Sequence, residues 1–441
     1  MPPPTPKTRR NLSADGLFRT LQSGFERIPD HRPRPSIPLR DALLSAFAMF
    51  SLKDPSLLAF DKRRADANLK SLYGIGQIPS DTRMREILDP VDPQQLRPLF
   101  NDVFRDLQRG KALEQFVFHE GCYLLALDGT GYFSSPTVHC NSCLQKVNSR
   151  TGEVTYSHQM LGAVLVHPDF REVIPLAPEP IIKQDGTTKN DCERNAAKRL
   201  LRKVRQEHPH LRVLVIEDGL ASNGPHIREL QDLNMHFLLG AKPGDHAFLF
   251  EKLLDEYDND RVTTLTYQLP GGGSREISFA HGLPLNEANP DLLLNFLQCH
   301  EFDAAGNTQK VFSWVTDLEL TSQNAPHLVR GGRARWKIEN ETFNTVKNQG
   351  YQFEHNFGHG EQNLSVVLAM LMMLAFLVDQ TQQLCCPLFQ AVWEKSGSKR
   401  GLWDQIRSHF RHFVFTSMRH LYEVMLHDLA KNLRAPTLDT S

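Results

Sequence analysis

Apolar residues recur with three different spacings along the chain, and each spacing predicts a different kind of element. Between residues 14 and 113 they return every three or four positions, as in DALLSAFAMF, which predicts a bundle of short helices. After residue 120 they form near-continuous runs, which are typical of buried strands. The longest run, LSVVLAMLMMLAFLV at residues 364–378, has 15 residues. A membrane-spanning helix needs about 20 residues, so we expect a buried core helix.

Five apolar runs in the middle of the chain alternate with helical patterns. They are CYLLALDGTGYF, TYSHQMLGAVLVHP, EVIPLAPEPI, LRVLVIEDGLAS and MHFLLGAK, and a helix from Asp191 to Glu207 is expected between the third and the fourth. This alternation predicts an α/β sheet covered on both faces. Four more strand-like runs at residues 244–322, separated by Pro, Gly, Asn and Asp, predict a β-rich insertion.

Charge is distributed unevenly, although 50 Lys and Arg nearly balance 51 Asp and Glu over the whole chain. Residues 1–40 carry eight basic and three acidic side chains, whereas residues 244–322 carry thirteen acidic and four basic ones. Residues 395–434 are again basic. Basic ends that flank an acidic insertion indicate separate modules, and they favour a nucleic-acid partner for the ends.

These patterns divide the chain into five predicted parts. A helical DNA-binding module comes first, an insertion splits the α/β core in two, and a helical segment follows the core. The expected bounds are 1–118 for the helical module, 119–243 and 323–384 for the two parts of the core, 244–322 for the insertion, and 385–441 for the C-terminal segment.

A short helix after residue 80 is the candidate DNA reader of the first module. Ser80 or Asp81 can cap its amino end, and Arg83 and Arg85 could contact phosphate groups. The segment predicts a small helix-turn-helix, but a plain helical bundle fits the same residues.

Cysteine usage and the amino end indicate the cellular compartment. Seven cysteines, two of them adjacent as Cys385 and Cys386, do not resemble a secreted disulfide framework. The start MPPPTPKTRR has no apolar core behind its charges, so it is not a secretory signal. We expect a cytoplasmic protein that does not enter the membrane.

Two aspartates follow apolar strands directly. Asp128 and Asp218 each precede a glycine at the carboxyl end of a strand, where an open α/β sheet exposes side chains in a crevice. Either residue alone could form an Asx turn or cap a helix. A third acid is needed to favour chemistry at this edge.

The stretch RWKIENETFNTVKNQGY, residues 335–351, supplies that acid on a predicted helix. Glu339 projects from a partly apolar face, with Arg335 one turn before it, whereas Glu341 points about 200° away and is the poorer ligand. Trp336, Ile338 and Phe343 are expected to seat the helix on the sheet. Charges scattered on a solvated helix are the alternative for this stretch taken alone.

Three carboxylates that converge without His or Cys form a hard, oxygen-rich site. Such a site suits Mg²⁺ or Mn²⁺. Two ions held about 3.5–4 Å apart can serve the attacking and leaving oxygens of a phosphodiester. Asp128, Asp218 and Glu339 are therefore the candidate catalytic and metal-binding residues, with two ions.

ALDGTGYF, VIEDGLASNGPHI and RWKIENETFNTVKNQGY together resemble the DDE transposases of bacterial insertion sequences. The resemblance covers about residues 120–380 and implies an RNase H-like core with a β-rich insertion before the helix that carries the Glu. It also implies an enzyme that binds terminal inverted repeats of double-stranded DNA. By the same resemblance, the enzyme would be a homodimer that cleaves and transfers DNA strands by a metal-dependent, cut-and-paste route.

The resemblance also implies DNA-binding residues. Arg335 matches a recurring Arg, and Lys347 corresponds to a Lys that usually stands seven residues after the Glu but here stands eight after it. Gly332 occupies the place of a Tyr. Trp314 is expected either to stack on a flipped base or to be a core residue of its strand, and Arg333 completes the predicted DNA-binding set.

Two other classes of protein fit part of these observations. One is an RNase H-like nuclease that does not transfer strands, and the other is a domesticated, catalytically silent DNA-binding protein. Intact Asp128, Asp218 and Glu339 speak against the second, because nothing structural demands all three.

Three weaker patterns accompany these. Cys140-x-x-Cys143, with His139 and His158, is either a zinc knuckle or a hairpin that contains thiols. The basic run from Lys183 to Arg205 is either a solvated helix face or a DNA-backbone surface. Its acids, Asp191 and Glu193, could compete as metal ligands or simply favour a helix N-terminus.

Overall fold

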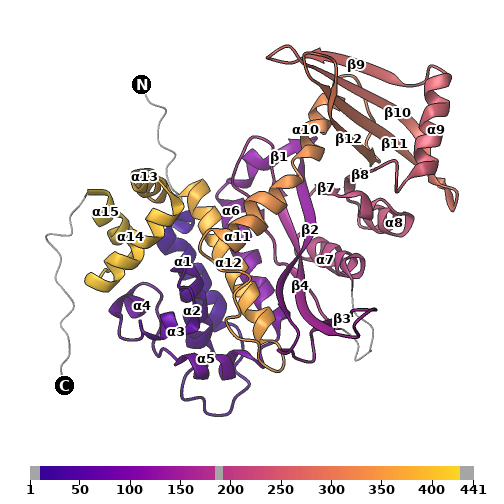
Figure 1. Ribbon diagram of the computed structural model, residues 1–441. Coiled ribbons are helices and arrows are strands. Elements are labelled where there is room, and N and C mark those ends of the chain that lie inside the picture. The colour runs from indigo at the N-terminus through magenta and orange to yellow at the C-terminus, as the bar shows by residue number, and fades with distance from the viewer. Residues whose placement is uncertain (1–9, 184–191, 428–441) are drawn as a thin grey trace, which may run out of the picture.

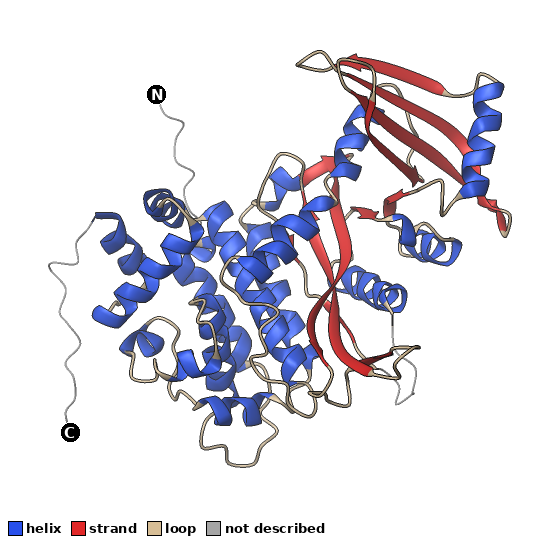
Figure 2. Ribbon diagram, viewed as in Figure 1, coloured by secondary structure: helices blue, strands red, loops and turns tan. Residues whose placement is uncertain are grey.

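The computed structural model describes residues 10–183 and 192–427. Within them, a body of helices lies beside a long twisted sheet, and the far end of that sheet extends away from the helices (Figure 1). Figure 2 shows that the strands gather in this sheet and that helices make up the body beside it. Along the described chain the strands run from Val117 to Thr316, with helices before, between and after them. The protein is therefore a mixed α/β protein, as the sequence predicts.

The amino-terminal part is helical up to residue 116. Its helices bury the faces that the three-to-four spacing predicts, for example Met84, Ile87 and Leu88 of α5. Ser80 caps α5 by accepting a hydrogen bond from the backbone N–H of Arg83. The elements are η1 (Arg10–Leu12), α1 (Ala14–Glu26), α2 (Leu39–Ser51), α3 (Leu57–Asp61), α4 (Ala67–Ser71), α5 (Asp81–Leu88), η2 (Pro93–Leu96), α6 (Arg97–Arg109) and η3 (Leu113–Phe116).

The sheet has the order β3-β4-β2-β7-β8-β12-β11-β10-β9, with β1, β5 and β6 paired at its sides. β2 is antiparallel to β4 and parallel to β7, which is in turn parallel to β8. The core strands are β1 (Val117–His119), β2 (Cys122–Ser135), β3 (Leu144–Val147), β4 (Val154–Val166), β5 (Ile174–Pro175), β6 (Glu179–Ile181), β7 (Val213–Glu217) and β8 (His236–Gly240).

The predicted insertion continues the same sheet. β12 pairs with β8 in antiparallel fashion, and β11, β10 and β9 follow outward from it. The bounds are β9 (Thr263–Gln268), β10 (Ser274–Asn286), β11 (Asn289–Phe302) and β12 (Thr308–Thr316), with α9 (Ala247–Asp258) beside them. Residues 244–322 are thus β-rich, as expected, and they form the outer end of one sheet.

Helices cover both faces of the core strands. α7 (Glu193–Glu207) and α8 (Gly224–Asp232) lie on one side, and α10 (Ala325–Arg333), η5 (Ile338–Phe343), α11 (Asn344–Asn348) and α12 (Leu364–Cys385) lie on the other or at its end. α13 (Pro387–Ser396), α14 (Lys399–His412) and α15 (Met418–His427) close the helical body.

α12 is the central helix of that body. It is long and apolar enough to cross a membrane, but 94% of its most apolar window is buried inside the protein. It packs against α2, α6 and α13. Its burial explains why the apolar pattern runs all round this helix and is not confined to one face.

A buried ion pair joins the amino-terminal helices to α12. Lys53 Nζ lies 2.6 Å from a carboxylate oxygen of Asp379, and each side chain is only 1% exposed. The Tyr351 hydroxyl also contacts Asp379, and the Lys53 ammonium lies 4.0 Å from the centre of the Tyr351 ring. The chain that follows the candidate Glu is thereby tied to both α2 and α12.

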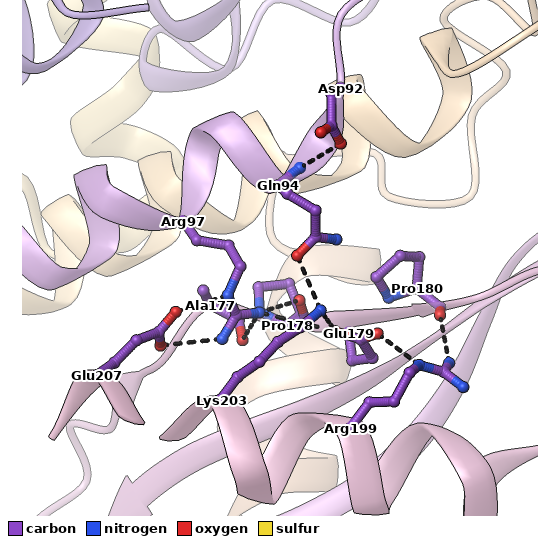
Figure 3. Close-up of polar contacts among 10 residues, drawn as sticks. All are labelled: Asp92, Gln94, Arg97, Ala177, Pro178, Glu179, Pro180, Arg199, Lys203 and Glu207. Atoms are coloured by element: carbon purple, nitrogen blue, oxygen red, sulfur yellow. Dashed lines mark hydrogen bonds and ion pairs between the residues drawn. The ribbon is translucent and has the colours of Figure 1, made fainter. Parts of the chain in front are cut away.

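A second polar cluster docks α7 on the sheet (Figure 3). Glu179 of β6 is buried, and its carboxylate binds Arg199 at 2.8 Å and Lys203 at 2.7 Å. Arg97 at the start of α6 pairs with Glu207 at 2.7 Å. The basic run of α7 was predicted to face solvent or DNA, and this is wrong for Arg199 and Lys203, because acids elsewhere in the fold bind them.

Candidate active site

Asp128 and Asp218 come together at one edge of the sheet. Ala126 of β2 pairs with Ile216 of the parallel strand β7, so each aspartate lies two residues further along its own strand. One oxygen of each is fixed locally. Asp128 Oδ1 accepts from the Gly129 N–H at 2.9 Å, and Asp218 Oδ1 accepts from the Leu220 N–H at 3.0 Å and so caps η4 (Gly219–Ala221). A turn or cap role does not occupy the second oxygen of either carboxylate.

Glu339 lies on a helix that the sequence predicts only in part. Residues 338–343 form a π-helical turn between α10 and α11, and not a continuous α-helix through residue 351. A π turn brings residues five apart onto one face. Ile338 and Phe343 both lie against Gly162 of β4, where a methyl group would be about 3.0 Å from the Phe343 ring. Packing on Gly162 therefore accounts for the wide turn.

Arg335 bridges two of the candidate acids. Its guanidinium lies 2.6 Å from Glu339 Oε1 and 3.4 Å from Asp128 Oδ2. The arginine side chain is 25% exposed and that of Asp128 is 24% exposed, so solvent screens both contacts only in part. The helix and the middle of β2 are thus joined through opposite charges. The prediction that Asp128 stands at the carboxyl end of its strand is wrong, because β2 continues to Ser135 by pairing with β4.

The electrostatics show that the three acids share one neighbourhood. Burial raises the pKa of Asp128 to about 6; Arg335 opposes this rise, and the negative charges of Glu339 and Asp218 add to it. Burial and Asp218 also raise the pKa of Glu193. Like charges that raise one another's pKa favour the approach of cations.

A cleft of about 710 Å³ opens at this edge, and its lining includes Asp128, Asp218 and Glu193. Glu193 reaches the strand backbone here, because its carboxylate lies where a side chain on Gly129 would be. Asp191 lies outside the described residues. Of the two extra acids, Glu193 is thus placed beside the candidate site.

The donor set fits a hard divalent cation. Its atoms are carboxylate oxygens, as Mg²⁺ and Mn²⁺ prefer. Among the described residues, however, the one group of three or more ligand atoms within 4.8 Å of one another belongs to Cys and His residues elsewhere. Arg335 links the carboxylates of Asp128 and Glu339, Asp218 lines the same cleft as Asp128, and the three carboxylates are not closed around one point.

The predicted DNA-binding side chains have partners within the protein. Lys347 pairs with Glu354 at 2.8 Å, and Arg333 pairs with Glu301 of β11 at 2.6 Å. Trp314 is 6% exposed and packs flat on Gly332, where any side chain would collide with the indole. Of the two alternatives for Trp314, the structure shows the core residue. Its contact with Gly332 explains why a glycine stands at the position where the resemblance would place a Tyr.

Two other residues of the quoted stretch have different surroundings from those expected. Trp336 is 44% exposed, so the prediction that it seats the helix on the sheet is wrong; Ile338 and Phe343 do so. Its exposure follows from the π turn, which gives the sheet-facing positions to the other two. Glu341 pairs with Arg171 at 3.2 Å and does not contact the other acids.

The cleft also contains residues that sequence reasoning missed. Lys146 brings positive charge to its lining, beside Arg194 of the predicted basic run, and Glu217 and His226 form a pair at 2.9 Å within it. Glu217 directly precedes Asp218 in VIEDG, and that adjacent acid was the available signal. For Lys146 no signal exists, because the antiparallel pairing of β3 with β4 brings it to the cleft.

Comparison with known proteins gives the family. The chain matches the family described as "Transposase DDE domain" over residues 151–377, a little over half of its length. Asp218 and Glu339 lie inside the matched segment, and Asp128 lies before it. No curated protein matches the sequence. The fold and this match together show that the chain belongs to the transposase DDE domain family, whose members are DNA transposases.

Proposed function

We propose that this protein is the transposase of a bacterial insertion sequence, with an RNase H-like core. It would bind the terminal inverted repeats of its element and catalyse cut-and-paste strand cleavage and strand transfer on double-stranded DNA. The proposal rests on two observations in a chain of this family: Asp128 and Glu339 share Arg335, and Asp128 and Asp218 line one cleft. The cleft beside the site is lined by four acids as well as Lys146 and Arg194, so a polyanion would bind there through these two cations together with metal ions held by the acids.

The proposed metal ligands are Asp128, Asp218 and Glu339, and the proposed cofactor is two Mg²⁺ or Mn²⁺ ions. When bound, these ions would lower the charge barrier to attack on a phosphodiester. The backbone N–H groups of Gly129 and Leu220 hold one oxygen of each aspartate and so orient the other oxygen. This orientation restricts both carboxylates before any ligand arrives, which reduces the entropic cost of binding.

Arg335 would exchange partners when DNA arrives. In the protein alone it neutralises Glu339 and Asp128, at 2.6 and 3.4 Å. A guanidinium can hold phosphate through two hydrogen bonds, so we propose that Arg335 binds the backbone beside the scissile bond. Lys347 and Arg333 would join it by giving up their pairs with Glu354 and Glu301. For Trp314, base stacking would require it to leave its packed position on Gly332.

Recognition of the ends is assigned to the amino-terminal helices. Arg83 and Arg85 of α5 are exposed, and among residues 10–183 and 192–427 their ion pairs are to Glu86 and Asp81 of the same helix. Pairs of this kind contribute about 0.2–0.5 kcal/mol each, so phosphate can replace them at little cost. Because two transposon ends must meet, we propose a homodimer acting in the cytoplasm.

The alternatives differ in products. An RNase H-like nuclease would cut but not join, and a domesticated DNA-binding protein would bind but not cut. The test uses the DNA that flanks the gene as substrate: a plasmid carrying both flanks, a target plasmid, purified protein and Mg²⁺. We expect excision of the flanked segment and its insertion into the target. Cleavage without joined products would establish the nuclease, and binding without cleavage would establish the silent protein.

A further inference from the structure

A second polar centre lies on the same sheet, away from the carboxylates. Cys140 and Cys143 in the loop after β2, His158 of β4 and His359 in the loop before α12 place their four ligand atoms within 4.8 Å of one another. All four residues are buried, with exposures of 8, 0, 0 and 8%. Three separate parts of the chain therefore meet here, and they bring two sulfurs and two imidazoles.

We propose that these four side chains bind one structural Zn²⁺ ion. Tetrahedral zinc with bonds of about 2.3 Å to sulfur and 2.0–2.1 Å to nitrogen sets its ligand atoms about 3.8 Å apart for two sulfurs and about 3.5 Å for a sulfur and a nitrogen. The Sγ atoms of Cys140 and Cys143 are 3.8 Å apart. His158 Nε2 lies 3.4 Å from each Sγ, and His359 Nε2 lies 3.2 Å from the Sγ of Cys143. These four distances match the edges of a tetrahedral zinc site, and all four ligand atoms lie within 4.8 Å of one another.

Hydrogen bonding alone explains the cluster poorly. Both histidines turn Nε2 toward the sulfurs, although Nδ1 of each ring is buried and has no hydrogen-bond partner among the described residues. A thiol is a weak partner, so this orientation gains little from hydrogen bonds and leaves a buried polar atom unsatisfied on each ring. Coordination of a metal ion by Nε2 would explain why both rings have this orientation.

Charge and burial also favour zinc. Each cysteine would bind as a thiolate and release its proton to solvent, and two thiolates neutralise a divalent ion, so the buried site carries no net charge. The backbone N–H of Cys140 donates to the Sγ of Cys143 at 3.4 Å and would support that thiolate. Four protein ligands leave no open position, which is typical of a structural site and not of a catalytic one.

The surroundings hold the ligands in place before an ion binds. The rings of His158 and Tyr132 are stacked at 5.9 Å, and His359 lies 4.4 Å from the ring of Phe133. On the other side of His359, Asp89 accepts hydrogen bonds from four successive N–H groups at the start of α12. The loop that carries His359 is therefore fixed from two directions.

The ion would hold in place the chain that follows the candidate Glu helix. That helix packs on Gly162 of β4 through Ile338 and Phe343. Four residues earlier on the same strand, His158 shares the Cys143 sulfur with His359. Zinc would thus tie the loop at residues 349–363 to the β2–β3 loop and to β4. This role concerns folding and needs no assumption about the reaction.

The test measures the metal content of the full-length protein purified without chelator. We expect about one zinc per chain in the wild type and loss of that zinc in Cys143→Ser and His359→Asn. His139→Asn is the matched control: His139 adjoins Cys140 but stacks on Tyr156 and is not in the group, so this variant should keep its zinc. Cys299→Ser, a buried cysteine of β11, should also keep it.

A second measurement on the unmutated chain guards against variants that fail to fold. Protein stripped with a chelator and reloaded with Co²⁺ should show the visible absorption of tetrahedral cobalt and a sulfur-to-cobalt charge-transfer band. Two more thiols should react with a thiol reagent after stripping than before it. A folded wild type that lacks zinc and gives no tetrahedral cobalt spectrum would overturn the proposal. So would a Cys140–Cys143 disulfide, or full zinc in His359→Asn.

Discussion

The carboxylate site and the Cys and His cluster lie on the same sheet, and yet they are built in opposite ways. At the carboxylate site, Asp128 remains 24% exposed, the acids repel one another, and Arg335 lies between two of them. In the cluster the four ligand atoms already lie within 4.8 Å, and all four side chains are buried. One centre is open and charged, which suits exchange of ions and substrate. The other is closed, which suits a permanent ion.

The difference also shows what each centre demands of the fold. Three distant segments meet at each centre, but the three carboxylates are exposed or half-buried, so they can be replaced with little loss of packing. The cluster residues are all buried between their segments, so they hold the fold together. Changes in the cleft should therefore alter activity with little effect on stability, and changes in the cluster should alter both.

The largest effect is expected on removal of divalent ions from the reaction. Cleavage of end DNA should require Mg²⁺ or Mn²⁺, and Ca²⁺ should suppress it because Ca²⁺ takes its oxygens at about 2.3–2.6 Å and in looser geometry. The measurement is strand cleavage on a gel, at matched ionic strength. Since a buried zinc ion would leave slowly, a brief EDTA treatment followed by Mg²⁺ should restore cleavage. Full activity in EDTA would disprove the role of the acids as metal ligands.

Loss of a zinc ligand should come next in size. Cys143→Ser should lower the melting temperature, because the loop at residues 349–363 would no longer be linked to β4 through the ion. The fraction of protein that is folded and able to cleave DNA should fall in consequence. Thermal unfolding of this variant is compared with that of Cys299→Ser, which removes a buried thiol outside the cluster. Equal melting temperatures for the two variants would show that Cys143 contributes no more to stability than an ordinary buried cysteine.

The ion pair between Lys53 and Asp379 measures how firmly the amino-terminal helices are joined to the core. Both side chains are 1% exposed, so Asp379→Asn should lower the free energy of unfolding by about 3–5 kcal/mol, through an unpaired buried ammonium. Lys53→Met with Asp379→Leu should cost less than the single change, since no buried charge remains. Urea unfolding curves measure both. A larger cost for the double variant would show that the pair itself is the stabilising contact.

Arg335 should give the smallest effect. Arg335→Ala should weaken binding of end DNA and reduce the slope of log K against log salt by about 0.9 for one lost phosphate contact. The melting temperature should change little, because its pair with Glu339 is of the i,i+4 kind and lies partly in solvent. Affinities are measured over a salt series without metal, with Arg335→Lys as the conservative control. Equal slopes and equal affinities would show that Arg335 does not touch DNA.

Much of the fold could be predicted because its signals are local. Apolar runs predicted the core strands and the strands of the insertion. The end of an apolar run marked both aspartates, although only Asp218 follows the end of its strand and Asp128 lies in the middle of β2. The π turn could not be predicted, because it depends on Gly162, a residue more than 170 positions away from it in the sequence. The partners of Arg199 and Lys203 were missed for the same reason, since Glu179 lies on another element.

The two centres differ most in what the sequence reveals of them. Each acid of the cleft stands at a recognisable place on its own element, so the three could be found separately. In the cluster, only Cys140 and Cys143 form a local motif. His359 joins Cys143 across 216 residues, and the neighbouring His139 points elsewhere. A site closed by tertiary contacts cannot be completed from spacing alone.

The most direct test of the account compares Glu339→Gln with wild type and with Glu341→Gln, a second acid two positions along the same helix. Cleavage in Mg²⁺, binding of end DNA and zinc content are measured on the same preparations. We predict that Glu339→Gln loses more than about 100-fold in cleavage, since even the residues behind metal ligands cost 10–100-fold. It should keep its zinc and nearly all of its DNA binding. Glu341→Gln should cleave within a few-fold of wild type, because its carboxylate pairs with Arg171, whereas that of Glu339 shares Arg335 with Asp128. Cleavage by Glu339→Gln at the wild-type rate, or loss of zinc in that variant, would contradict the separation of a catalytic carboxylate centre from a structural zinc centre.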